Sequence, residues 1–122
     1  QRLLEAVGDV EWVEDEGLLD AVTAVSGGGP AYVFLLMEAL ADAGVAAGLP
    51  RELSNSIARK TVEGSGELSR LASEPPETLR KNVMSPGGTT AEAIAVLDAE
   101  DGIRPLVERA IAAATKRSRE LA

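Results

Sequence analysis

The sequence contains no cysteine and no histidine. Disulfide bonds, thiolate nucleophiles, Ser-His catalysis and the usual zinc ligands are therefore excluded from this chain, and we expect no metal site. Aromatic residues are also scarce, since Trp12, Tyr32 and Phe34 are the only three. A core made of Ala, Leu, Val and Ile with so few rings indicates closely packed helices. Any chemistry must use hydroxyl, carboxylate or lysine groups, or a bound cofactor.

Basic residues are outnumbered, with 12 Lys and Arg against 20 Asp and Glu and a net charge of −8. We expect no nucleic-acid partner, because phosphate binding needs a positive face. No apolar run is long and uninterrupted enough to span a bilayer, so no membrane partner is expected either. The start shows no secretory signal pattern, and the lack of cysteine fits a cytoplasmic location.

The first fifteen residues differ from the rest of the chain. Residues 1–7 are typical of a helix end stopped by Gly8, and residues 9–14 alternate as a β-strand does. A lone strand leaves unpaired edges. We therefore expect residues 1–15 to be the tail of a sheet-containing domain of a longer protein, although a hairpin partner or a local extended arm remains open.

Residues 16–122 are predicted to form an all-α bundle of five or six helices. An apolar helical segment over 18–25 is interrupted by the glycines before Pro30, and further helices follow over 31–44, 51–71, 77–83, about 90–97 and from 103 to the end. The segment 31–44 is apolar nearly all round, which is typical of a buried helix. This helix is too apolar for a small monomer, so we expect partner helices from a second copy of the chain.

Two features of this region are ambiguous. The run Ser26-Gly27-Gly28-Gly29 precedes a helix and could cradle an anion or act as a tight hinge; it matches neither a dinucleotide fingerprint nor a P-loop. Glu38 and Asp42 lie one turn apart, where they could form an acid–base pair or the solvated stripe of a packed helix.

The stretch from Ser85 to Glu92 reads SPGGTTAE and is a loop that turns into a helix. Thr89 followed by Glu92 fits a capping box, so Thr89 is the predicted N-cap and Thr90 the first helical residue. The first turn of a helix has free N–H groups and the positive end of the dipole, which suit a carboxylate or phosphate. The pattern also fits an ordinary helix start without a ligand.

Several stretches taken together resemble one known family. They are Ala24–Phe34 (AVSGGGPAYVF), Glu38–Val45, Gly48–Arg51, Val83–Thr90 (VMSPGGTT) and Arg117–Leu121. In this order and spacing the chain is similar to the C-terminal half of pyrroline-5-carboxylate reductase, and the resemblance covers nearly the whole chain. It departs from the family pattern at Gly28, Lys60 and Ala91.

The resemblance implies an NADPH- or NADH-dependent reduction of 1-pyrroline-5-carboxylate to L-proline. It implies that a preceding dinucleotide-binding domain holds the cofactor, so the chain alone should be inactive. It further implies an interleaved homodimer that can assemble to a decamer.

The resemblance also implies the site. Ser85, Gly87, Gly88, Thr89 and Thr90 would hold the substrate carboxylate, and the Thr90 hydroxyl would be catalytic, placed near the ring nitrogen. Two alternatives remain: an inactive helical oligomerisation module of the same fold, and a dehydrogenase of similar build acting on another small acid.

Overall fold

The computed structural model describes the backbone of residues 2–6 and 9–13, and residues 18–122 with their side chains. Strand β1 (Arg2–Ala6) pairs antiparallel with β2 (Asp9–Val13). The strand predicted from residue 9 is confirmed over 9–13, and its partner is a hairpin strand. The helix end predicted for residues 1–7 is wrong over 2–6, because cross-strand bonding outweighs the marginal stability of so short a helix. The predicted stop at Gly8, strand residue 14 and the domain boundary near residue 15 lie outside the described residues.

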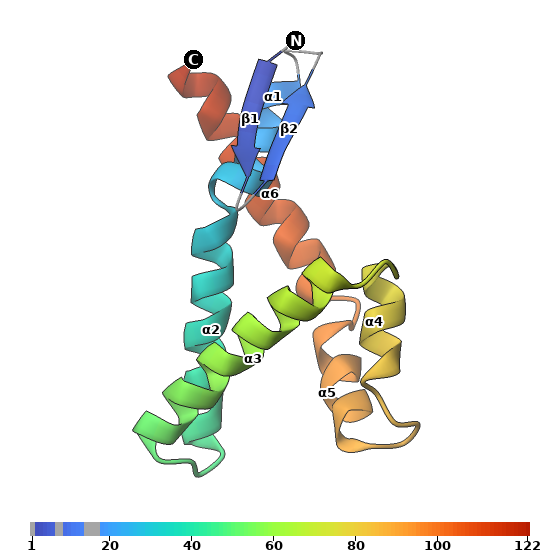
Figure 1. Ribbon diagram of the computed structural model, residues 1–122. Helices are drawn as coiled ribbons and strands as arrows, with labels where there is room; N and C mark the ends of the chain where they lie inside the picture. The colour runs from blue at the N-terminus through green and yellow to red at the C-terminus, as the bar shows by residue number, and fades with distance from the viewer. Residues whose placement is uncertain (1, 7–8, 14–17) are drawn as a thin grey trace. The chain divides into compact units, whose positions relative to one another are not determined.

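From residue 18 onward the described chain is helical, as the sequence predicts (Figure 1). Six α-helices and one π-helical turn follow one another: α1 (Leu19–Val22), η2 (Thr23–Gly27), α2 (Gly29–Ala46), α3 (Arg51–Leu71), α4 (Pro76–Asn82), α5 (Thr89–Leu97) and α6 (Ile103–Leu121). The all-α class is confirmed, and the bounds predicted for α3 are those observed. Helix α4 begins one residue before its prediction, at Pro76, where a proline is well tolerated because the first N–H groups of a helix lack partners anyway.

The glycine run does not interrupt the helix as expected. The N–H of Gly28 donates to the Thr23 carbonyl oxygen over 3.2 Å, which closes a π-helical turn and leads into α2 at Gly29. The helical stretch Leu19–Ala46 is consequently long and apolar enough, by length and composition alone, to cross a membrane. The expectation that no segment is long enough is therefore wrong, although the core helix of a soluble protein meets the same criterion.

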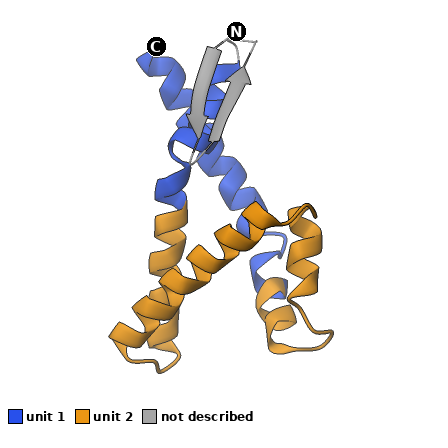
Figure 2. Ribbon diagram, in the orientation of Figure 1, with its two compact units in different colours: residues 1–32, 95–122 blue, residues 33–94 orange. Residues whose placement is uncertain are grey.

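The chain divides into two compact units, residues 1–32 with 95–122 and residues 33–94 (Figure 2). In the first unit, α6 packs against α1 and η2. The Ser118 hydroxyl donates to the Asp20 carboxylate over 2.7 Å, and the Arg119 Nε lies 3.9 Å from the other carboxylate oxygen of Asp20. These polar contacts fix the last turns of α6 on α1.

In the second unit, a small serine joins α2 to α3. Ser54 is only 1% exposed, and its hydroxyl donates to the Ala41 carbonyl oxygen over 2.6 Å. The neighbouring helix ends are joined by the Arg51–Asp42 ion pair at 2.8 Å. Small side chains at the contact let the two helix backbones approach closely.

Little of the apolar surface is buried within the chain. Among residues 18–122 the buried positions are all small: Ala24, Ala41, Ser54 and Ala58. Large apolar side chains of α2 are exposed, including Phe34 at 59% and Leu35 at 65%. The expectation that α2 is buried is thus wrong for the single chain, because the helices described here cover only part of its surface.

Candidate functional site

The loop between α4 and α5 is a tight turn with a defined hydrogen bond. The Gly88 N–H donates to the Ser85 carbonyl oxygen over 2.9 Å. Pro86 occupies the second position of this turn, and Gly87 follows with φ of +71°. Proline at the second position and a positive φ at the third are the signature of a type II turn, in which only glycine sits without strain. The sequence SPGG is therefore suited residue by residue to this geometry.

Gly88 is needed for a different reason from Gly87. A Cβ atom on Gly88 would lie 3.1 Å from the Ser85 carbonyl oxygen and 3.3 Å from the Ser85 Cβ. Any larger residue would thus press on the first residue of the turn. The two glycines consequently have separate tasks, one conformational and one steric.

Helix α5 begins at Thr89, one residue earlier than predicted. The predicted N-cap is therefore wrong by one residue, because Thr89 is already helical directly after the turn. Thr89 and Thr90 are the first two helical residues, and both are exposed. Neither residue belongs to the buried core of residues 18–122.

Three backbone donors converge at this helix start. The N–H groups of Thr89, Thr90 and Ala91 have no backbone acceptor within residues 18–122, as expected for the first turn of a helix. The helix dipole adds a positive partial charge at the same place. Gly88 differs, because its N–H is already used inside the turn. Thr89, Thr90 and Ala91 are therefore the donors that could hold an anion here.

The two carboxylates singled out on α2 have different surroundings. Asp42 forms an ion pair with Arg51 across to α3 at 2.8 Å, and both side chains are more than half exposed. Glu38 instead lines a pocket between the same helices. The geometry favours the solvated-stripe interpretation over an acid–base pair.

The first glycine run contains a structural contact that the sequence does not predict. The Tyr32 hydroxyl donates to the Ala24 carbonyl oxygen over 2.6 Å and so spans the π-helical turn. A Cβ atom on Gly28 would lie 2.6 Å from that hydroxyl oxygen. Because the Gly28 N–H is also occupied, this turn suits a rigid helical continuation better than an anion cradle. Spacing alone could not reveal it, because Tyr32 lies eight residues from Ala24 and no common motif has that separation.

Comparisons with known proteins agree with the helical architecture. Residues 16–121 match the family model for pyrroline-5-carboxylate reductase dimerisation. The chain is 48% identical over 121 residues to pyrroline-5-carboxylate reductase of Pseudomonas aeruginosa and 50% identical to that of Synechocystis. Each alignment covers 99% of this chain, but only 44% and 45% of the respective relatives. The chain thus spans less than half the length of these relatives.

Two solved structures extend the likeness to three dimensions. A pyrroline-5-carboxylate reductase from Coxiella burnetii superposes with a TM-score of 0.86 at 40% identity, over 91% of this chain and 41% of that one. The enzyme from Plasmodium falciparum, solved with NADP bound, gives a TM-score of 0.80 at 40% identity, over 87% of this chain and 40% of that one.

Proposed function

The chain belongs to the pyrroline-5-carboxylate reductase dimerisation family, and from this premise we propose that it is the dimerising and substrate-binding part of an enzyme that reduces 1-pyrroline-5-carboxylate to L-proline. In this proposal residues 1–15 are the tail of a dinucleotide-binding domain, and residues 16–122 form the helical domain. The observation that carries the proposal is the donor-rich start of α5 behind its type II turn.

The substrate is a small carboxylate with a ring imine, and the loop offers groups for both ends. The N–H groups of Thr89 and Thr90 can bind the carboxylate. In this proposal the hydroxyl of Ser85, the first residue of the turn, adds a further hydrogen bond. Gly87 and Gly88 act here by shape, since they form the turn and leave space for the anion. The Thr90 hydroxyl would donate to or accept from the ring nitrogen and so orient the imine carbon.

The described residues do not fit a dinucleotide. Both glycine runs follow helical elements, Ser26–Gly29 within and after η2 and Ser85–Gly88 after α4, whereas a dinucleotide cradle follows a strand. The proposal therefore places NADPH or NADH mainly on residues outside this chain. The bound nicotinamide would supply the hydride, and this chain would supply carboxylate binding and orientation.

The exposed apolar surface supports a homodimer. Large side chains of α2, α3 and α6 are 40–69% exposed in the single chain, among them Leu36, Ile57, Leu68, Leu106 and Val107. Soluble monomers rarely leave large apolar patches exposed, and each of the two units carries several such side chains. The proposal is an interleaved homodimer that can assemble further to a decamer, located in the cytoplasm, with no nucleic-acid or membrane partner.

The test is oxidation of NADPH and of NADH by the full-length protein with 1-pyrroline-5-carboxylate. Thr90→Ala should lower kcat about 10- to 100-fold with the dimer intact, because one hydrogen bond to a charged group is lost. Thr115→Ala is the matched control, since among residues 18–122 the Thr115 hydroxyl bonds only to the Ile111 carbonyl within α6.

Two results would count against the proposal. Unchanged kinetics in Thr90→Ala would remove that residue from the mechanism. No turnover from a folded, NADPH-binding dimer would leave the protein as a helical oligomerisation module or as a reductase of another small acid. Binding of another small carboxylate to that dimer, in preference to L-proline, would favour the reductase over the module.

A further inference from the structure

A pocket of about 510 Å³ lies between α2 and α3, apart from the Ser85–Thr90 loop. It lies wholly within the second compact unit. Its lining combines one carboxylate, one guanidinium, an amide, a hydroxyl and two apolar side chains: Glu38, Arg59, Asn55, Ser56, Met37 and Ala41. A lining of this kind has an acceptor for a cation, a donor for an anion and an apolar floor.

The two charged residues do not satisfy each other. Glu38 extends from α2 and Arg59 from α3, and neither forms an ion pair with another residue in the range 18–122. The same two helices do allow such a pair, since Asp42 and Arg51 meet at 2.8 Å near their connecting turn. The carboxylate and guanidinium thus line the same pocket from two different helices without pairing with each other.

We propose that this pocket binds a small zwitterion, an α-amino acid with an apolar side chain. Its ammonium group would lie at Glu38 and its carboxylate at Arg59, where the planar guanidinium can donate two parallel hydrogen bonds. A carboxylate on one helix and a guanidinium on the other can bind the two ends of one zwitterion at the same time, with hydrogen bonds of about 2.8 Å at each end. The apolar side chain would rest on Met37 and Ala41.

The remaining lining residues support this polarity. Asn55 and Ser56 lie on α3, one turn before Arg59, and can add hydrogen bonds to the same carboxylate. A second, smaller pocket of about 170 Å³ between α2 and α3 is mainly apolar, with Leu40, Leu49 and Ile57 in its lining. The apolar lining of that pocket suits another apolar surface, whereas the charged lining of the larger pocket suits a polar ligand.

The two methionines of this chain provide separate reporters. Met37 lines the pocket, whereas Met84 adjoins Ser85 at the proposed substrate loop. Methyl-labelled methionine in the full-length protein, assigned with Met37→Leu and Met84→Leu, therefore distinguishes binding at the two places by NMR. The proposed function can fail while this test succeeds, and the reverse also holds.

The probe is L-leucine, compared with 4-methylpentanoate, which lacks the ammonium group, and 3-methylbutylamine, which lacks the carboxylate. We expect L-leucine to shift the Met37 signal with a Kd in the millimolar range, because both charged walls are open to water. Either single-charge analogue should bind about five- to tenfold more weakly. Glu38→Gln and Arg59→Gln should each weaken L-leucine by a similar factor.

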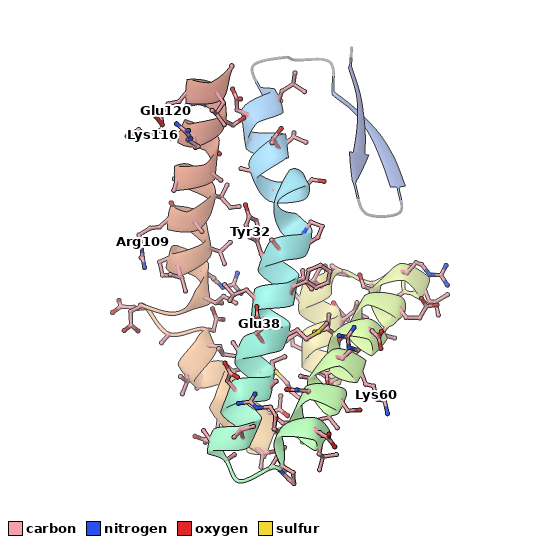
Figure 3. The ribbon with its side chains drawn as sticks, turned by 90° about the vertical axis from the view of Figure 1, so that its left-hand side faces the viewer. Tyr32, Glu38, Lys60, Arg109, Lys116 and Glu120 are labelled. Atoms are coloured by element: carbon pink, nitrogen blue, oxygen red, sulfur yellow. The ribbon has the colours of Figure 1, made fainter. Side chains whose placement is uncertain are left out.

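Lys60→Gln is the control for Arg59→Gln. Lys60 is the adjacent cation on α3, and it points away from α2 (Figure 3). This variant should leave the L-leucine titration unchanged. The proposal is overturned if Met37 does not respond to L-leucine, if the three probes bind alike, if only Met84 responds, or if both pocket variants titrate as the unaltered protein does.

Discussion

Replacing Gly44 by alanine should destabilise the protein, although alanine is the better helix former. A Cβ atom at this position would collide with the Ser54 hydroxyl oxygen and lie 3.3 Å from the Leu49 Cδ1. That hydroxyl cannot simply turn away, because it is buried and donates to the Ala41 carbonyl oxygen. Gly44 and Ser54 therefore form one packed unit at the crossing of α2 and α3.

The magnitude follows from three opposing effects. The change gains up to about 1 kcal/mol of helix propensity. Overpacking a close contact costs about 1–3 kcal/mol, and leaving the buried Ser54 hydroxyl without its acceptor costs about 1–3 kcal/mol. Either the close contact stays overpacked or the Ser54 hydroxyl loses its acceptor, so only one of the two costs applies. After the gain in helix propensity is subtracted, we expect a net loss of about 1–2 kcal/mol in the free energy of unfolding.

A double-mutant cycle makes the reasoning testable. Ser54→Ala alone should cost about 0.5–1.5 kcal/mol, because one hydrogen bond is lost. Gly44→Ala in the Ser54→Ala background should cost much less than in the native background, giving a coupling energy of about 1 kcal/mol or more. The assay is urea unfolding at one fixed protomer concentration, since dimer formation contributes to apparent stability. Equal costs of Gly44→Ala in both backgrounds would refute the close approach.

Three further predictions concern other helices. Tyr32→Phe removes the hydroxyl that bonds to the Ala24 carbonyl, so the protein should lose about 0.5–1.5 kcal/mol in urea unfolding and exchange its amide hydrogens faster around η2; unchanged exchange would contradict this. Gly64→Ala should stabilise α3 by up to about 1 kcal/mol, because no described atom lies within 4 Å of the added Cβ. If sedimentation instead shows a weaker dimer for this variant, a partner helix crosses at Gly64. The hydrogen bond from Arg70 lowers the pKa of Glu67 below its ordinary 4.5, so its stabilising effect is present above that value and fades as the pH falls through the folded-state pKa. The urea midpoint of Glu67→Gln should therefore fall less steeply than that of the unaltered protein as the pH drops below about 4.5. The same pH dependence in both proteins would disprove the link.

Much of the helical architecture follows directly from sequence. The apolar recurrence from Arg51 to Leu71 and the glycine at 102 before α6 give local signals strong enough to locate both helices. The SPGG turn can equally be predicted from sequence, because proline fixes its own φ and glycine permits the positive φ that the turn needs. The register of Thr89 was missed by one residue, since helix ends depend on the exact exit of the turn.

Other features depend on contacts that no local pattern encodes. The π-helical turn needs the Tyr32 hydroxyl to reach back to Ala24, and glycines in a row suggested an interruption instead. The strand β1 was mistaken for a helix end because its strand character comes from pairing with β2. The pocket between Glu38 and Arg59 brings together residues that are twenty-one positions apart, and Arg59 carries no motif of its own.

The π-helical turn Thr23–Gly27 is the place where this part of the chain can change its length. Such a turn holds one residue more than an α-helical turn would, because its hydrogen bond joins residues five apart instead of four. Deleting one residue there would permit a regular helix and would leave the flanking helices nearly in phase. Deleting a residue from the regular part of the helix between Asp20 and this turn would instead rotate Asp20 by about 100° and shift it by about 1.5 Å relative to α2. Asp20 would then leave the Ser118 hydroxyl on α6.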